Sequence, residues 1–190
     1  MKNKFIRVFT LAVCCVMFVL AAAGCGNSAD YKAMASAFEK VSSATKIVKT
    51  IEVANNGALL RSVKEEYTKN QSGYELIVTT SVRNPIGSEE DFTTSVSEAS
   101  QIASDKADFG KFPAESIFSS ALYKTNGGET LLIATIPSSK LKEAGIDDSS
   151  KISGNVTFVS STKNGSFSQL KLRYVSENQN QVIITYDYSF

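Results

Sequence analysis

The chain has 190 residues, 43% of them hydrophobic, and a formal net charge of +1. This length and apolar content suit one folded domain with a targeting segment and exclude an extensively disordered chain. Three of the 20 basic residues precede Cys25, which leaves 17 basic against 19 acidic residues in the rest of the chain. The balance provides no basic field for a nucleic acid, so no nucleic-acid partner is expected.

Histidine is absent, and no cysteine follows Cys25. Without histidine the chain lacks Ser-His-Asp and Cys-His nucleophiles, histidine general bases and the usual zinc sites. The part after Cys25 has no internal disulfide. The sequence therefore predicts a protein that is not an enzyme and has no cofactor and no metal site.

The amino-terminal segment has the three-part plan of a secretory signal peptide. Lys2, Lys4 and Arg7 supply positive charge, residues 8–23 are apolar apart from Thr10, and small residues follow. The apolar part is shorter than the roughly 20 residues that a spanning helix needs.

Ala22-Ala23-Gly24-Cys25 resembles the lipobox of bacterial lipoprotein signal peptides. The resemblance implies cleavage between Gly24 and Cys25, a thioether-linked diacylglycerol on Cys25, and an extracytoplasmic protein anchored to the cell membrane. Two acyl chains are enough for stable anchoring. It also implies the division of the chain: a removed signal peptide (1–24), a lipidated tether (25–29) and one globular domain (30–190). Two other interpretations of Cys25 stay open, the end of an uncleaved anchor helix and a free or paired thiol.

The first element expected after the tether is an amphipathic helix over residues 30–45. Tyr31, Met34, Phe38 and Val41 recur at intervals of three and four, which is the spacing of one helix face. Packing of this stripe on the domain core is the main interpretation, and a helix lying on the membrane surface is the alternative.

Alternation of apolar and polar residues then predicts β-strands. Asn55-Asn56-Gly57 is a strong hairpin signal, because Asn and Gly tolerate positive φ. The expected strands are centred on these apolar series and segments: Ile47, Ile51 and Val53; Leu59, Val63 and Tyr67; Tyr74, Leu76, Val78 and Val82; Phe92 to Ser97; and Glu129 to Ile136.

Short helices are expected between some of these strands. Pro113 favours a helix start, with a buried stripe at Ile117, Phe118, Ala121 and Leu122. A second short helix is expected from Ser138 to Ala144, closed by Gly145. Residues 98–112 show no clear pattern.

The carboxyl-terminal part predicts three antiparallel strands joined by short turns at Lys163-Asn164-Gly165 and at residues 177–180. Their apolar series are Ile152, Val156 and Phe158; Leu170, Leu172 and Tyr174; and Val182, Ile184, Tyr186, Tyr188 and Phe190.

Together these elements predict an α+β fold: an amino-terminal helix, then a curved, mostly antiparallel sheet of about seven or eight strands with one or two short helices. This order of elements resembles the lipoprotein-carrier and mycobacterial lipid-binding lipoprotein group, whose members place a half-barrel sheet over helices. The resemblance implies an apolar cavity between sheet and helices.

The expected function is that of a lipoprotein, anchored at Cys25, which binds a lipid or other apolar molecule. Tyr186, Tyr188, Phe190 and Phe38 are the candidate ligand-binding residues, and core packing is the alternative fate of the aromatic strip. A structural or interaction module with a solid core, meeting another envelope protein, is the alternative function.

A hydrolase is the third hypothesis. Four Ser-x-x-Lys spacings resemble the serine–lysine pair of penicillin-recognising enzymes, but the companion motifs of that class are absent. The four pairs are Ser43 and Lys46, Ser139 and Lys142, Ser160 and Lys163, and Ser168 and Lys171. The acidic groups 89–91 and 147–148 lack the pattern of a calcium loop.

Overall fold

A computed structural model describes residues 28–86, 91–146 and 151–190. The predicted signal peptide (1–24), with Gly24 in its lipobox, and Cys25 lie outside these residues. Within the described ranges, no helix has the length and apolar character needed to cross a membrane.

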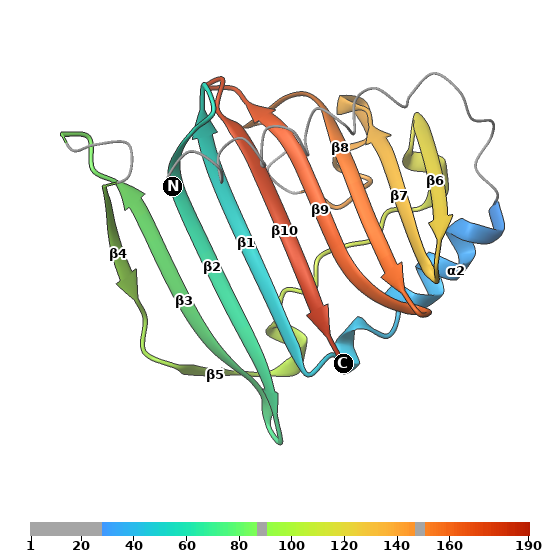
Figure 1. Ribbon diagram of the computed structural model, residues 1–190, viewed down its shortest axis with the longest axis horizontal. Coiled ribbons are helices and arrows are strands. Elements are labelled where there is room, and N and C mark those ends of the chain that lie inside the picture. The colour runs from blue at the N-terminus through green and yellow to red at the C-terminus, as the bar shows by residue number, and fades with distance from the viewer. Residues whose placement is uncertain (1–27, 87–90, 147–150) are drawn as a thin grey trace.

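One antiparallel sheet dominates the described residues (Figure 1). Its order is β4-β3-β2-β1-β10-β9-β8-β7-β6, and β5 also pairs with β3. The ten strands are β1 (Lys46–Asn55), β2 (Ala58–Asn70), β3 (Gly73–Arg83), β4 (Phe92–Val96), β5 (Ser100–Ile102), β6 (Ser120–Asn126), β7 (Glu129–Ile136), β8 (Ile152–Lys163), β9 (Ser166–Ser176) and β10 (Gln181–Ser189).

The helical elements of the described chain are one α-helix and four short 3₁₀ turns. They are α2 (Ser28–Phe38), η1 (Val41–Ser43), η2 (Ser104–Lys106), η3 (Glu115–Ile117) and η4 (Ser138–Lys140). The expected α+β class is therefore confirmed in its coarse form, a mostly antiparallel open sheet with one α-helix.

The first and last strands meet in the middle of the sheet. β1 and β10 pair in antiparallel fashion, with Ile47 opposite Tyr188 and Ile51 opposite Ile184. This pairing joins two meanders, β1–β5 on one side and β6–β10 on the other, into one sheet.

Two predicted hairpin turns are confirmed. Asn56 and Gly57 between β1 and β2 have φ of 47° and 82°, and Asn164 and Gly165 between β8 and β9 have φ of 51° and 79°. Positive φ at both central residues is the conformation of tight hairpin turns whose twist matches the flanking strands.

The prediction of seven or eight strands was too low. The additional strands are β5, in the segment without a clear pattern, and β6, which covers much of the helix expected after Pro113. The chain makes only the η3 turn there, and Ala121 and Leu122 then pair with Ala134 and Ile133 of β7. Gly127 and Gly128, with φ of 57° and 82°, form the hairpin turn that makes this pairing possible.

The amino-terminal helix is shorter than the predicted range of 30–45. α2 ends at Phe38, and the chain turns through η1 before β1 begins at Lys46. The predicted apolar stripe is nevertheless confirmed, because Met34 is fully buried and Val41 is 4% exposed. Val41 and Ala44, which follow the end of α2, are buried in the core as well.

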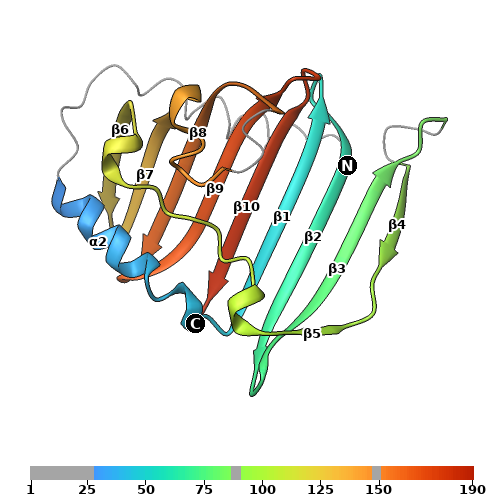
Figure 2. The ribbon, with the colours of Figure 1, turned by 180° about the vertical axis from the view of Figure 1, so that it is seen from behind.

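The helix and one long connection cover the same face of the sheet, which we call the inner face (Figure 2). We call residues 107–117 of that connection the strap. Phe112 of the strap packs on Phe158 and Phe167 with ring centroids 5.6 and 5.7 Å apart, and Phe38 of α2 lies 5.0 Å from Phe167. Such aromatic pairs contribute about 0.5–1.5 kcal/mol each beyond the apolar area they bury.

Gly73 at the start of β3 should be intolerant of a side chain. Its φ is +144°, and a Cβ atom there would overlap the carbonyl oxygen of Ile102 in β5. We expect Gly73→Ala to lower the free energy of unfolding by about 1–3 kcal/mol, measured by urea denaturation. Gly154→Ala is the control, because its φ is +83° but the space around it is open; equal losses in the two variants would contradict the steric explanation.

Candidate functional site

Rows of side chains run across the inner face, because directly paired residues of antiparallel strands point to the same side. One row passes through Val63, Ile51, Ile184, Leu172 and Phe158 by successive pairings. Phe158 is fully buried, whereas the other four are only half-buried. The row thus leads from the packed core to apolar surface that solvent reaches.

We call Val53, Ile51, Val63, Ile184 and Leu172 the open face. All five are apolar and half-buried; the last four are paired in succession across the strands, and Val53 is the next inward residue of β1 after Ile51. In Figure 2, α2 and the strap lie over other parts of the sheet, and the upper parts of β10, β1 and β2 carry no described helix. The open face is therefore a continuous apolar surface on a curved sheet.

A charged cluster lies on the next row of the inner face. Lys49 is paired across the strands with Glu65 and Tyr186. Its Nζ lies 2.8 Å from Asp108 Oδ2 of the strap and 3.3 Å from Glu65 Oε2. Tyr186 donates to Asp108 Oδ2 at 3.0 Å, and Tyr67 donates to Glu65 Oε2 at 2.5 Å. We call these five residues the Lys49 cluster.

The Lys49 cluster stabilises the charged forms of Asp108 and Lys49. Burial would raise the pKa of the Asp108 carboxyl, but hydrogen bonding and attraction from Lys49 outweigh burial and lower it. Burial would lower the pKa of Lys49, and its bond to Asp108 reverses that and raises it. Burial raises the pKa of the Tyr186 hydroxyl most, and the negative charge of Asp108 and the hydrogen bond to it raise that pKa further. The carboxylate and the ammonium therefore stabilise each other in their charged forms.

Further hydrogen bonds fix the strap along its length. Tyr188 donates to the carbonyl oxygen of Phe109 at 2.6 Å, and Tyr31 of α2 donates to that of Pro113 at 3.0 Å. Gly110 has φ of +71°, and a Cβ there would lie 3.3 Å from the Tyr186 ring. The strap thus passes directly over the aromatic side chains of β10.

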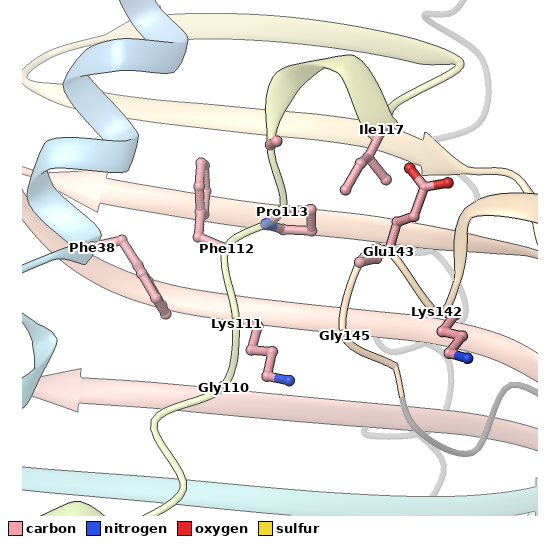
Figure 3. A pocket seen from close by; sticks show the side chains of 11 residues that line it. Phe38, Gly110, Lys111, Phe112, Pro113, Ile117, Lys142, Glu143 and Gly145 are labelled. Atoms are coloured by element: carbon pink, nitrogen blue, oxygen red, sulfur yellow. The ribbon is translucent and has the colours of Figure 1, made fainter.

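A pocket of about 540 Å³ lies beside the strap and opens to solvent (Figure 3). Its wall combines apolar side chains with charged ones on the loop after η4. The lining includes Phe38, Gly110, Lys111, Phe112, Ile117 and Lys142. The sequence led us to expect a cavity between sheet and helices, but the space directly between α2 and the sheet is filled by the aromatic core.

The four candidate ligand-binding residues lie in different surroundings. Tyr186 and Tyr188 are 6% and 7% exposed, and their hydroxyls bind the strap. Phe38 packs in the core and also lines the pocket. Phe190 lies beyond the end of β10 and is 51% exposed. Three of the four therefore gather around the strap, and Phe190 does not join them.

The serine–lysine spacings are not brought together as pairs. Ser43 donates to the carbonyl oxygen of Lys40, Ser168 bonds with Ser161, and Ser160 Oγ is buried without a partner. In the described part of the chain, no hydrogen bond joins Ser139 to Lys142 either. Among these residues, no group of three or more acidic, His or Cys side chains is arranged to hold a metal ion.

The Lys49 cluster is the feature that analysis of the sequence missed. The apolar series Ile47, Ile51, Val53 skips position 49, and the series Leu59, Val63, Tyr67 skips position 65. A charged residue at an inward position of two neighbouring strands was the available signal, because a buried charge requires a partner. The third charged residue of the cluster, Asp108, lies in residues 98–112, where the sequence shows no clear apolar period.

Comparisons with known proteins identify no family. No family model matches the chain, and no curated protein matches it. Among solved structures, the crystal structure of LprF from Mycobacterium bovis is similar, with 11% sequence identity and a TM-score of 0.47. The similarity covers 87% of this chain and 95% of that one. The proposals below therefore depend on this chain's own residues.

Asp108→Asn should loosen the strap. We expect it to lower the free energy of unfolding at pH 7 by about 1–2 kcal/mol, less than a fully buried ion pair, because solvent screens a carboxylate that is 42% exposed. Since the folded protein lowers the pKa of Asp108, its contribution is present above the ordinary carboxyl pKa and is lost as pH falls through the folded value.

Urea unfolding of both proteins at pH 7 and pH 3 measures this difference, which should shrink at the lower pH. Asp105→Asn is the matched control. Asp105 is exposed, and its ion pair with Lys106 is long at 3.7 Å and lies in solvent, so its loss should change stability little. A difference between wild type and Asp108→Asn that persists undiminished at pH 3 would count against the electrostatic role.

Proposed function

We propose that this chain is an extracytoplasmic lipoprotein, anchored to the cell membrane through Cys25, whose domain binds an apolar ligand or lipid and catalyses no reaction. The observation that carries the proposal is the open face, where half-buried apolar side chains continue the rows of the core. Each methylene that a ligand buries on such a surface contributes about 0.8 kcal/mol.

The neighbouring pocket supports a ligand of limited size. Its volume of about 540 Å³ lies within the range of small-molecule sites. Gly110 lines the pocket and packs on Tyr186, and Ile184 of the open face is the next inward residue of β10. Pocket and open face are thus adjacent parts of one surface.

The polar groups of the inner face favour binding over catalysis. Lys49, Glu65 and Asp108 are engaged with one another and with two tyrosines. Their position between strap and sheet gives them a structural task, and a general acid or base would need access to a substrate.

The binding test uses 1-dodecanol, an uncharged probe, with the full chain in an uncharged detergent and native mass spectrometry as the readout. We expect Ile51→Thr combined with Val63→Thr to weaken dodecanol binding about ten-fold, because polar hydroxyls replace apolar contact area. The control pair, Val48→Thr with Ile77→Thr, lies on the outer face of the same sheet and should bind as wild type does. Equal binding by both pairs would refute the open face as the site.

Cys25→Ser tests the anchor, which depends on the lipobox alone. We expect the substituted chain to lose the mass of the acyl chains and to move from the membrane fraction to the soluble extracytoplasmic fraction. Fractionation and intact-mass measurement provide the readout. A chain that stays membrane-bound with its mass changed only by the substitution would disprove lipidation.

An interaction module is the second candidate function. Val82, Ile86 and Val96 of the β3–β4 edge are 46%, 97% and 64% exposed, and an exposed apolar group at a sheet edge suits contact with an envelope protein. The dodecanol experiment separates the two functions, because a chain that binds no apolar probe fits the second one.

A further inference from the structure

The pocket beside the strap has a charged end, marked by two lysines, and a largely apolar end. In Figure 3, Lys111 and Lys142 extend toward the same end, with Gly145 between them. Phe112, Pro113 and Ile117 lie toward the other end, and the side chain of Glu143 also extends there, beside Ile117. Two basic groups at one end and mostly apolar side chains at the other match a molecule that is itself divided into a charged and an apolar part.

The two lysines at the charged end have no ion-pair partner among the described residues. In the described ranges, neither lies within ion-pair distance of a carboxylate. Glu143 also lines the pocket, but its two carboxylate oxygens accept hydrogen bonds from Lys140 at 2.9 and 2.8 Å. The described lining of the pocket therefore carries an excess of positive charge that an anion would neutralise.

The position of Lys111 is set by its neighbour across the pocket. Gly145 has φ of +74°, and a Cβ atom there would overlap the Lys111 side chain. The end of the Lys111 side chain, from Cδ to Nζ, thus lies directly against the backbone of the loop that carries Lys142. Close packing of this kind brings two ammonium groups from separate segments to one end of the pocket.

We propose that this pocket binds an anionic amphiphile, with Lys111 and Lys142 holding its phosphate or carboxylate headgroup and the apolar wall of the pocket holding its chain. This inference rests on the proposed function, because it names the ligand class of the same surface. Lysine suits the task, since its ammonium binds phosphate as a compact charge with three donors.

The experiment compares two probes with the same chain, dodecyl phosphate and 1-dodecanol, and inorganic phosphate alone. The full chain in an uncharged detergent is titrated with each, and native mass spectrometry counts the bound probe. We expect wild type to bind dodecyl phosphate about ten-fold more tightly than dodecanol, which is the scale of hydrogen bonds to a charged group. Inorganic phosphate alone should bind far more weakly than dodecyl phosphate.

The test variant combines Lys111→Gln with Lys142→Gln. We expect it to lose the preference for dodecyl phosphate and to keep its affinity for dodecanol. The matched control combines Lys124→Gln with Lys163→Gln, two exposed lysines outside the pocket. It removes the same charge and should behave as wild type. Lys111→Arg with Lys142→Arg should retain the preference.

Three results would overturn the headgroup assignment. They are equal binding of both alkyl probes by wild type, an equal loss in the test and control variants, and binding of inorganic phosphate as tight as that of dodecyl phosphate. In the first two cases dodecanol binding still supports the proposed function. If neither alkyl probe binds, the proposed function fails together with the inference.

Discussion

A sheet of ten strands has a wide inner face, and the eleven residues of α2 cover only part of it. Every apolar side chain left without cover costs free energy in water, so the chain extends its cover with the strap, an irregular segment. The strap brings Phe109 and Phe112 onto the core and leaves Ile51, Val63 and Ile184 half-buried. The inner face is divided into a packed part and an open part because α2 and the strap together cover only part of the sheet.

The Lys49 cluster lies where the two parts meet. An irregular segment on an apolar sheet has backbone polar groups that need partners, and the tyrosine hydroxyls of α2 and β10 provide two of them. Asp108 adds a charged contact to Lys49. The tyrosines that the sequence marked as candidate ligand contacts thus hold the strap with their hydroxyls. Their rings belong to the core, and the adjoining apolar surface is the part open to a ligand.

Local patterns predicted most of the sheet, and particular residues explain the exceptions. Asn-Gly turns and strict alternation identified the hairpins β1–β2 and β8–β9, because turn type and strand period are local properties. β6 was predicted as helix because Ile117, Phe118, Ala121 and Leu122 have helical spacing. The run is so short that this spacing does not distinguish a helix from a strand. Its pairing with β7 decided the outcome. β5 has three residues, too few for any period to show, and it forms because β3 offers a free edge.

By itself, the sequence determined the class of the fold, the order of its main elements, the stripe of α2 and the resemblance of residues 22–25 to a lipobox, because each depends on residues close together in the chain. The tertiary structure alone decided the partners. It brought Asp108 to Lys49, placed Lys111 and Lys142 at one pocket, and separated Phe190 from Tyr186. These contacts join segments that lie far apart in the chain, and no local pattern in the sequence predicts which of them will meet. Only the folded arrangement of strap, loop and sheet creates the contacts.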